Sequence, residues 1–217
     1  MTDVRFILWD MDGTLINSEP QHYRAWQMTV KRLFGVEELD FEAYKACIGT
    51  TLPVTVRIIG DICGKDLTGE NVIPEHAADK RMLEELEGFP PMPGALETVR
   101  TLHERGIRMA VASSSPEEYL HRVVRALGIE DCFEACVSAI GCAHSKPAPD
   151  VFLKAMEVLG AKPEETVVVE DSGNGVLAGL AAGCRVIGFY NPDSGEQDIA
   201  PADVIVRDLR RIPALIN

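Results

Sequence analysis

Short apolar runs, each long enough for one buried strand, recur along the chain and constrain its fold more than any other feature. The runs are RFILW (5–9), RMAVAS (108–113), EACVSA (134–139), TVVVE (166–170), RVIGFY (185–190) and DVIV (203–206). Such runs are typical of parallel strands, because both faces of a parallel sheet are covered. Between several of them the apolar residues follow helical spacing instead, as at Leu120, Val123 and Leu127. This alternation predicts an α/β fold: a doubly wound, Rossmann-like parallel sheet with helices on both faces.

One long interval interrupts the alternation. Residues 17–91 contain the helical stretches HYRAWQMTVKRLF and EHAADKRMLEELE and no convincing strand. Proline and glycine mark both junctions, in LINSEP and GFPPMPG. We therefore expect residues 1–16 and 92–217 to form the α/β core, and residues 17–91 to form a helical domain inserted into it.

The charge of the chain argues against two classes of partner. The formal net charge is −13, and an acidic surface repels nucleic acid and anionic lipid. The sequence has no apolar run of the ~20 residues needed to cross a bilayer, and its start, MTDVRF, lacks the features of a signal peptide. The six cysteines form no CxxC pair, which favours reduced thiols over disulfides or a zinc site. We expect a cytoplasmic protein that binds neither nucleic acid nor membranes.

Two aspartates follow the first apolar run in the segment RFILWDMDGTL. Residues i and i+2 of a strand point to the same side, so Asp10 and Asp12 would face together if the strand extends that far. Two carboxylates so close repel each other, and either a bound cation or a proton held for acid–base work would relieve the repulsion. Taken alone, the pair could equally be a solvated strand end.

Three other strand ends carry functional groups of the same kind. The run TVVVE leads into Glu170 and Asp171, RMAVAS ends at Ser113, and Lys146 follows EACVSA within HSKPAPD. In a parallel sheet of this type, ligands bind at the carboxyl ends of the strands. Oxygen ligands combined with a phosphate suit Mg²⁺. Together these ends predict a site for a phosphoryl group and its metal.

Nearby residues have plainer explanations. In the segment SPEE (115–118), Ser115 fits an N-cap, with Pro116 as the first helical residue and Glu118 as its capping-box partner. We therefore assign Ser115 to capping and leave Ser113 as the functional candidate. Gly173 and Gly175 fit turn residues, with a weaker indication of an anion site at the start of a helix.

These motifs resemble those of the haloacid dehalogenase-like superfamily. They are DMDGTL, the serine that ends RMAVAS, Lys146 in SKPAPD, and EDSGNG, in the order that the family has them. The resemblance covers essentially the sheet domain. The helical insertion stands where the family places its C1 cap, and the stretch around HYRAW is similar to the subgroup of β-phosphoglucomutases and sugar-phosphate phosphatases.

The resemblance implies a role for each core residue. Asp10 would attack phosphorus and become an aspartyl phosphate, and Asp12 would protonate the leaving oxygen and then activate water. Mg²⁺ would be held by Asp10, the main-chain carbonyl of Asp12 and Asp171, with Glu170 close by. The phosphoryl oxygens would be held by Ser113 and Lys146. The cap would close over the site and contact the organic part of the substrate.

An aspartate two residues after the nucleophile favours phosphomonoester chemistry, because both a leaving group and a water then need proton transfer. Dehalogenases of the superfamily lack this acid, and its ion-pumping ATPases have threonine there. We therefore predict a Mg²⁺-dependent phosphatase that acts on a small phosphorylated metabolite, a sugar phosphate, and that is a monomer or weak dimer.

A β-phosphoglucomutase is the alternative enzyme. In the cap stretch CIGTTLPVTVR, Ile48 stands where those mutases would have a lysine, and the first basic residue is Arg57. This departure favours the phosphatase, whereas Ser18 and His22 match subgroup positions that favour the mutase; His22 also fits a polar residue on an amphipathic helix. The candidate substrate residues of the cap are Ser18, His22, Ile48, Thr50 and Thr51. A phospho-accepting signalling module is a third reading, which the large cap and Asp12 oppose.

Overall fold

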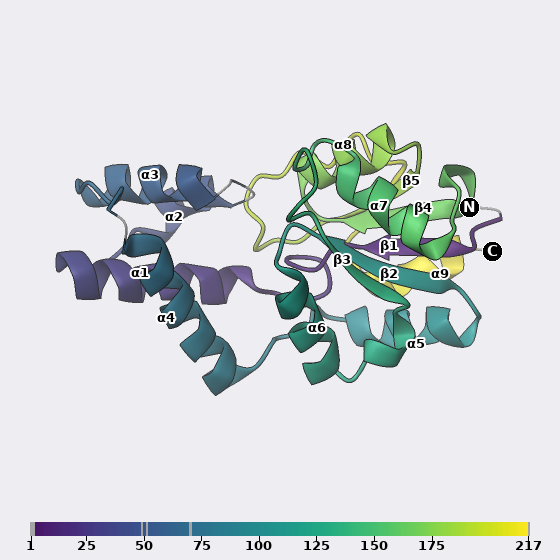
Figure 1. The fold of residues 1–217 in the computed structure, drawn as a ribbon, viewed down its shortest axis with the longest axis horizontal. Coiled ribbons are helices and arrows are strands. Elements are labelled where there is room, and N and C mark those ends of the chain that lie inside the picture. Colours follow the sequence, from purple (N-terminus) through teal and green to yellow (C-terminus); the bar gives the residue numbers. More distant parts are fainter. Residues whose placement is uncertain (1–2, 49, 51, 70, 217) are drawn as a thin grey trace. The chain divides into compact units, whose positions relative to one another are not determined.

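The protein is described by a computed structural model that covers residues 3–216 except 49, 51 and 70. The chain forms two compact units. Unit 1 contains residues 1–17, 91–192 and 197–217, and unit 2 contains residues 18–90 and 193–196. Figure 1 shows both units as ribbons.

Unit 1 is built on a six-stranded sheet in the order β3-β2-β1-β4-β5-β6, and every adjacent pair is parallel. The strands are β1 (Phe6–Trp9), β2 (Arg108–Ser113), β3 (Ala135–Ser138), β4 (Thr166–Glu170), β5 (Arg185–Phe189) and β6 (Val204–Val206). Each strand lies within one of the predicted apolar runs. The predicted parallel sheet is therefore confirmed.

Helices cover both faces of this sheet, as expected for a doubly wound fold (Figure 1). They are α5 (Ala95–Glu104), α6 (Glu117–Ala126), α7 (Asp150–Leu159), α8 (Gly173–Ala181) and α9 (Ile212–Leu215), with short 3₁₀ turns at Glu130–Cys132, Pro163–Glu165 and Leu209–Arg211. On the face covered by α7 and α8, Phe152 and Val176 pack against Leu8 and Val168 of the central strands. Helices α5 and α6 lie on the opposite face.

The register of the central strands brings their carboxyl ends to one edge. Trp9, the last residue of β1, pairs with Val111 of β2 and with Val169 of β4. The strand order runs outward from β1 in one direction and from β4 in the other, so the topological switch point lies between these two strands. The residues that follow β1 and β4 therefore meet where folds of this class bind ligands.

Unit 2 is helical. Its elements are α1 (Glu19–Phe34), α2 (Phe41–Tyr44), a 3₁₀ turn (Lys45–Cys47), α3 (Leu52–Cys63) and α4 (Val72–Glu87). Its core gathers Trp26, Val30 and Ile59 with neighbouring apolar residues, and the Trp26 ring stacks on His76 at 3.9 Å between centroids. The segment 193–196, which follows β5, groups with this unit, and Gly195 lies against Ile48.

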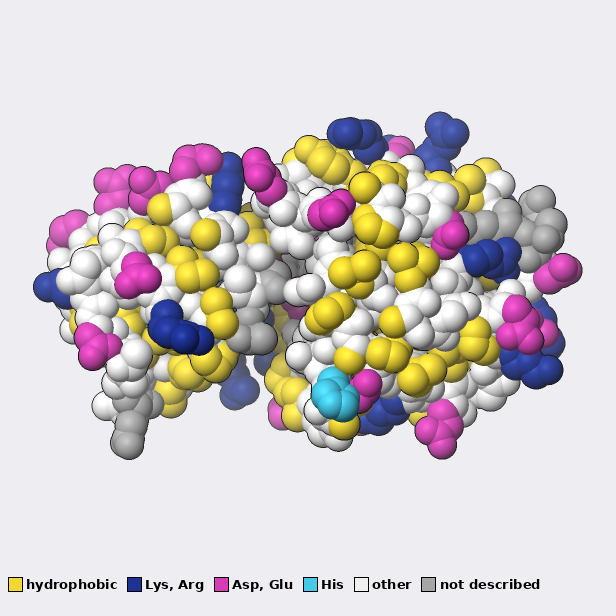
Figure 2. Space-filling view, turned by 90° about the horizontal axis from the view of Figure 1, so that it is seen from above, with side chains coloured by type: hydrophobic (Ala, Val, Ile, Leu, Met, Phe, Trp, Pro, Cys, Tyr) yellow, Lys and Arg dark blue, Asp and Glu magenta, His cyan; other side chains and the backbone are white. Residues whose placement is uncertain are grey.

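Helix hydropathy, the cysteines and the exposed hydrophobic side chains complete the description of the fold. The helices in the described part of the chain are all too short or too polar to cross a bilayer. All six cysteines are free thiols, as predicted. Large hydrophobic side chains are exposed on α7 and α8 at Leu153, Val158 and Leu177, and the space-filling view shows hydrophobic side chains spread over this side of unit 1 (Figure 2).

Candidate active site

Three side chains from separate strand ends of unit 1 meet in a buried ion-pair cluster. The Lys146 ammonium donates to Asp10 Oδ1 and to Glu170 Oε1, both at 2.6 Å. A weaker contact of 3.4 Å joins Lys146 Nζ to the carbonyl of Ala112 at the end of β2. The three charged side chains are 8%, 10% and 1% exposed for Lys146, Asp10 and Glu170. Water is largely excluded from these ion pairs, so the charges interact strongly.

Burial and charge shift the pKa values of Asp10 and Lys146. Burial raises the pKa of the Asp10 carboxyl well above its ordinary value; Lys146 opposes the rise, and the charges of Glu170 and Asp171 add to it. Burial by itself would lower the pKa of the Lys146 ammonium, but attraction to Asp10 and Glu170 outweighs it and raises that pKa. Lys146 therefore stays charged, and the unfavourable effect of burial falls on Asp10.

Asp171 completes an acidic group with Asp10 and Glu170, in which the carboxylate oxygens lie within 4.8 Å of one another. Thr14 Oγ1 donates to Asp171 Oδ1 at 3.0 Å and so fixes this carboxylate. The backbone at Gly13 passes so close that a Cβ atom there would lie 2.1 Å from Asp171 Oδ2. Gly13 also has a φ of 85°, a value that side chains disfavour. The DGT segment thus permits the approach that the acidic group requires.

Glu170 is held by the start of α8. Ser172 donates to Glu170 Oε2 from its backbone N–H at 3.0 Å and from its hydroxyl at 2.9 Å. The same hydroxyl accepts a hydrogen bond from the Gly175 N–H and so caps the helix. A Cβ atom at Gly175 would lie 1.8 Å from Glu170 Oε1. Gly175 of EDSGNG is therefore more than a turn residue, because it makes room for the carboxylate.

Asp12 is held by a different set of groups. Strand β1 ends at Trp9, so the strand alternation from which we expected Asp10 and Asp12 to face together does not extend to Asp12. Instead, Asp12 Oδ2 accepts from Ser115 Oγ at 2.6 Å, and Asp12 Oδ1 accepts from Tyr119 OH at 3.0 Å. The acidic group described above consists of Asp10, Glu170 and Asp171.

The prediction that Ser115 caps a helix is wrong. Helix α6 begins at Glu117, its N-cap is Pro116, and no side chain caps it. Ser115 lies one residue earlier, and its hydroxyl is turned to Asp12 instead. Ser113, the other candidate of this turn, is buried at the end of β2, and its Oγ accepts from the Ser115 N–H at 3.2 Å.

The candidate substrate residues of the described chain all lie in unit 2. Ser18 is buried at the N-cap of α1, with no hydrogen-bond partner for Oγ among the described residues. His22 stacks on His76 with centroids 6.4 Å apart. Thr50 Oγ1 donates to the Cys47 carbonyl at 2.7 Å. The remaining two are Ile48, which packs on the core of unit 2, and Thr51, which lies outside the described residues.

Several residues of the site were missed from the sequence. Asn191, just after β5, donates from Nδ2 to the Gly13 carbonyl at 3.0 Å, and the rule that polar residues follow strands could have found it. Thr14 stands inside the DGT motif and was not assigned to Asp171. Tyr119 gave no signal, because an aromatic residue on an otherwise apolar helix face predicts packing.

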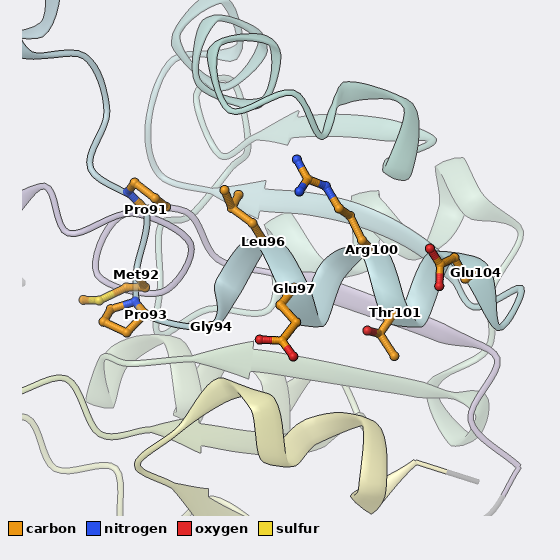
Figure 3. A pocket seen from close by; sticks show the side chains of 9 residues that line it. All are labelled: Pro91, Met92, Pro93, Gly94, Leu96, Glu97, Arg100, Thr101 and Glu104. Carbon is orange, nitrogen blue, oxygen red and sulfur yellow. The ribbon is translucent and has the colours of Figure 1, made fainter.

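A surface groove of about 580 Å³ runs along α5 (Figure 3). It is lined by Pro91, Met92, Pro93, Gly94, Leu96, Glu97, Arg100, Thr101 and Glu104. None of the residues predicted for the site lines it, so we do not assign the site to this groove.

Comparison with known proteins agrees with the geometry. A sequence family described as haloacid dehalogenase-like hydrolase matches residues 4–183. The chain belongs to the haloacid dehalogenase-like hydrolase family. The matched stretch spans β1 to the end of α8, and so includes Asp10, Lys146, Glu170 and Asp171.

Several proteins similar to this chain bear the names of phosphatases. Hexitol phosphatase A of Escherichia coli (strain K12) is 33% identical over 94% of this chain and 91% of its own length. Fructose-1-phosphate phosphatase of the same strain is 31% identical over 83% of this chain and 94% of its own. The solved structure of CbbY from Rhodobacter sphaeroides in complex with phosphate is 26% identical, covers 96% of each chain, and superposes with a TM-score of 0.79.

Proposed function

We propose that this protein is a Mg²⁺-dependent phosphatase that hydrolyses a small phosphomonoester, with a sugar phosphate as the substrate class, through an aspartyl-phosphate intermediate. The observation that carries the proposal is Asp10, buried between Lys146 and two further acids at the switch point of the sheet. Membership of a hydrolase family supports the reaction. Relatives named hexitol phosphatase and fructose-1-phosphate phosphatase support the substrate class.

The residues present fit a divalent cation. Three carboxylates and one ammonium leave this buried cluster with a formal charge of −3 + 1 = −2 when all are ionised. Carboxylate oxygens are the ligands that Mg²⁺ prefers. Asp10, Asp171 and the main-chain carbonyl of Asp12 would hold the ion, with Glu170 beside them. When bound, it would neutralise charge on the nucleophile and on the phosphoryl oxygens.

The side chains of unit 1 then have distinct tasks. Lys146 orients Asp10 through Oδ1, whereas Oδ2 accepts no hydrogen bond within the described part of the chain and is the atom that would attack phosphorus. Lys146 and Ser113 would hold the phosphoryl oxygens. Asp12 would give a proton to the leaving oxygen and take one from the water that hydrolyses the intermediate.

Unit 2 would act as the cap that selects the substrate. Ser18, His22, Ile48 and Thr50 are the described residues proposed to contact its organic part, and Thr51 belongs to the same proposal. We expect the enzyme to work in the cytoplasm, as a monomer or weak dimer, and to bind neither nucleic acid nor membranes.

Phosphate release from 4-nitrophenyl phosphate tests the chemistry. We expect turnover with Mg²⁺, loss of activity with EDTA and recovery when Mg²⁺ is added back. Asp10→Asn should abolish turnover while circular dichroism and the melting temperature stay close to those of the wild type. Asp131→Asn, at an exposed acid of the same unit, is the matched control and should keep full activity. Near-normal turnover by Asp10→Asn would refute its role as nucleophile.

A screen of phosphorylated metabolites tests the substrate class. We expect phosphate release from hexose or hexitol phosphates. Glucose 1-phosphate with a bisphosphate activator belongs in the screen, because isomerisation without phosphate release would identify a phosphoglucomutase instead. Labelling of the protein only once, without turnover of any phosphomonoester, would identify a phospho-accepting module.

A further inference from the structure

We propose that Tyr119 and Ser115 are positioning residues that orient the Asp12 carboxyl group for proton transfer. The inference rests on the proposed function, in which Asp12 serves as proton donor to the leaving group. It adds two residues of α6 and the turn before it, whose hydroxyls hold both oxygens of that acid.

The geometry places one hydroxyl on each oxygen of Asp12. Ser115 Oγ donates to Oδ2 at 2.6 Å and Tyr119 OH donates to Oδ1 at 3.0 Å. Tyr119 is buried in the first turn of α6, and Ser115 stands four residues earlier, in the turn that follows β2. Two donors on the two oxygens fix the plane of a carboxyl group, which a single hydrogen bond would leave free to rotate.

The turn that carries Ser115 is itself held by neighbouring strands. The Ser138 hydroxyl at the end of β3 donates to the Ser115 carbonyl at 2.7 Å and accepts from the Ile140 N–H at 3.1 Å. The Ser115 N–H donates to Ser113 Oγ at 3.2 Å. Ser115, which holds Asp12, is therefore fixed by Ser138 at the end of β3 and by Ser113 at the end of β2, the residue proposed to bind the phosphoryl group.

Hydroxyl groups suit an acid that changes protonation state. A serine or tyrosine hydroxyl can donate to a carboxylate and can also accept from a carboxylic acid, so hydrogen bonds to Asp12 can form in both of its protonation states. In the first step, the Asp10 oxygen forms a bond to phosphorus while the bond from phosphorus to the leaving oxygen breaks. The proton of the Asp12 carboxyl passes to that oxygen, which departs as an alcohol, and Asp12 is left as a carboxylate.

Leaving-group dependence tests the proposal. Phenyl phosphate and 4-nitrophenyl phosphate differ by one nitro group, but nitrophenolate is the weaker base and departs with less help from an acid. We expect Tyr119→Phe and Ser115→Ala each to lower kcat/KM for phenyl phosphate by about 10-fold, the effect of losing a hydrogen bond to a charged group. For 4-nitrophenyl phosphate, kcat/KM should fall by no more than about 2-fold, because nitrophenolate departs with little help from an acid. The ratio kcat/KM is the quantity to compare, because it reports only the steps up to departure of the leaving group.

Matched variants separate positioning from a merely structural role. Ser115→Thr keeps the hydroxyl and should restore the wild-type ratio between the two substrates. Tyr23→Phe removes another tyrosine hydroxyl, which donates to the Leu39 carbonyl in unit 2, and should leave the ratio unchanged. Asp12→Asn should change the ratio of kcat/KM between the two substrates in the same way as the double variant Ser115→Ala/Tyr119→Phe, with the larger loss on phenyl phosphate.

Equal losses on both substrates, or no loss on either, would overturn the positioning role while the wild type still turns over. If Tyr119→Phe does not fold, the Ser115→Ala and Ser115→Thr pair decides the matter alone. Absence of phosphate release by the wild type from both substrates would overturn the proposed function, and the inference with it.

Discussion

Replacing Lys146 with methionine removes the ammonium group that joins Asp10 to Glu170. Both ion pairs measure 2.6 Å, and the three side chains are at most 10% exposed. Methionine has nearly the length and volume of the lysine stem, so the substitution deletes a charge while leaving little empty space. The variant therefore isolates the electrostatic part of the cluster.

The structure sets the expected cost. Removing one partner of a buried ion pair typically destabilises a protein by about 3–5 kcal/mol, because the other charge stays buried without compensation. Here the ammonium serves two carboxylates, and Asp171 adds a third acid nearby. We therefore expect the upper part of that range. At ~2–4 °C per kcal/mol for a chain of this size, a loss of about 4–5 kcal/mol should lower the melting temperature by roughly 8–20 °C.

Urea unfolding measured in EDTA is the assay, since a bound cation would replace the missing charge. Lys154→Met, at an exposed lysine of α7, is the control and should change the free energy of unfolding by less than ~0.5 kcal/mol. Glu170→Gln should cost less in the Lys146→Met background than in the wild type, because it then removes an unpaired charge. A Lys146→Met variant as stable as Lys154→Met would refute the argument.

Three further outcomes follow from the same contacts. Gly175→Ala should lower the free energy of unfolding by about 1–3 kcal/mol and reduce turnover, because its Cβ would lie 1.8 Å from Glu170 Oε1. Thr14→Val removes the hydrogen bond to Asp171 and should raise the Mg²⁺ concentration for half-maximal activity by about 10-fold, within the range for groups that orient a metal ligand. Burial lowers the pKa of His76 to about 4. As the pH falls, the unfolded chain therefore protonates this imidazole at a higher pH than the folded chain does. Stability should then fall by about 3 kcal/mol between pH 7.5 and pH 4, and His76→Gln should remove that part of the pH dependence in urea melts.

Each of these outcomes has a matched control. Gly69→Ala places a Cβ where nothing lies within 4 Å, so equal losses at Gly69 and Gly175 would contradict the crowding argument. Thr68→Val removes a hydrogen bond to an exposed acid and should leave metal dependence unchanged. His144→Gln, at an exposed histidine, should keep the acid-dependent loss of stability; a His76→Gln variant that also keeps it would contradict the assignment.

The sequence by itself determined the sheet and the acids of its central edge. Apolar runs and helical spacing are local patterns, and each strand of the structure lies within a run that predicted it. Asp10, Glu170 and Asp171 could be predicted to lie close together because they stand at the ends of such runs, and a parallel sheet brings the carboxyl ends of its strands to one edge. The motif spacing also carried the resemblance to a family that the comparison with known sequences then confirmed.

Only the tertiary structure decided what the hydroxyls do. Ser115 has the local signature of a helix cap, yet its hydroxyl binds Asp12, 103 positions earlier in the chain, and Tyr119 reaches the same acid across 107 positions. The segment 193–196 likewise joined unit 2 although it follows a strand of unit 1. A hydroxyl or a loop can satisfy its hydrogen bonds in many local ways, so its partner is fixed by which distant groups the packed strands and helices bring within reach.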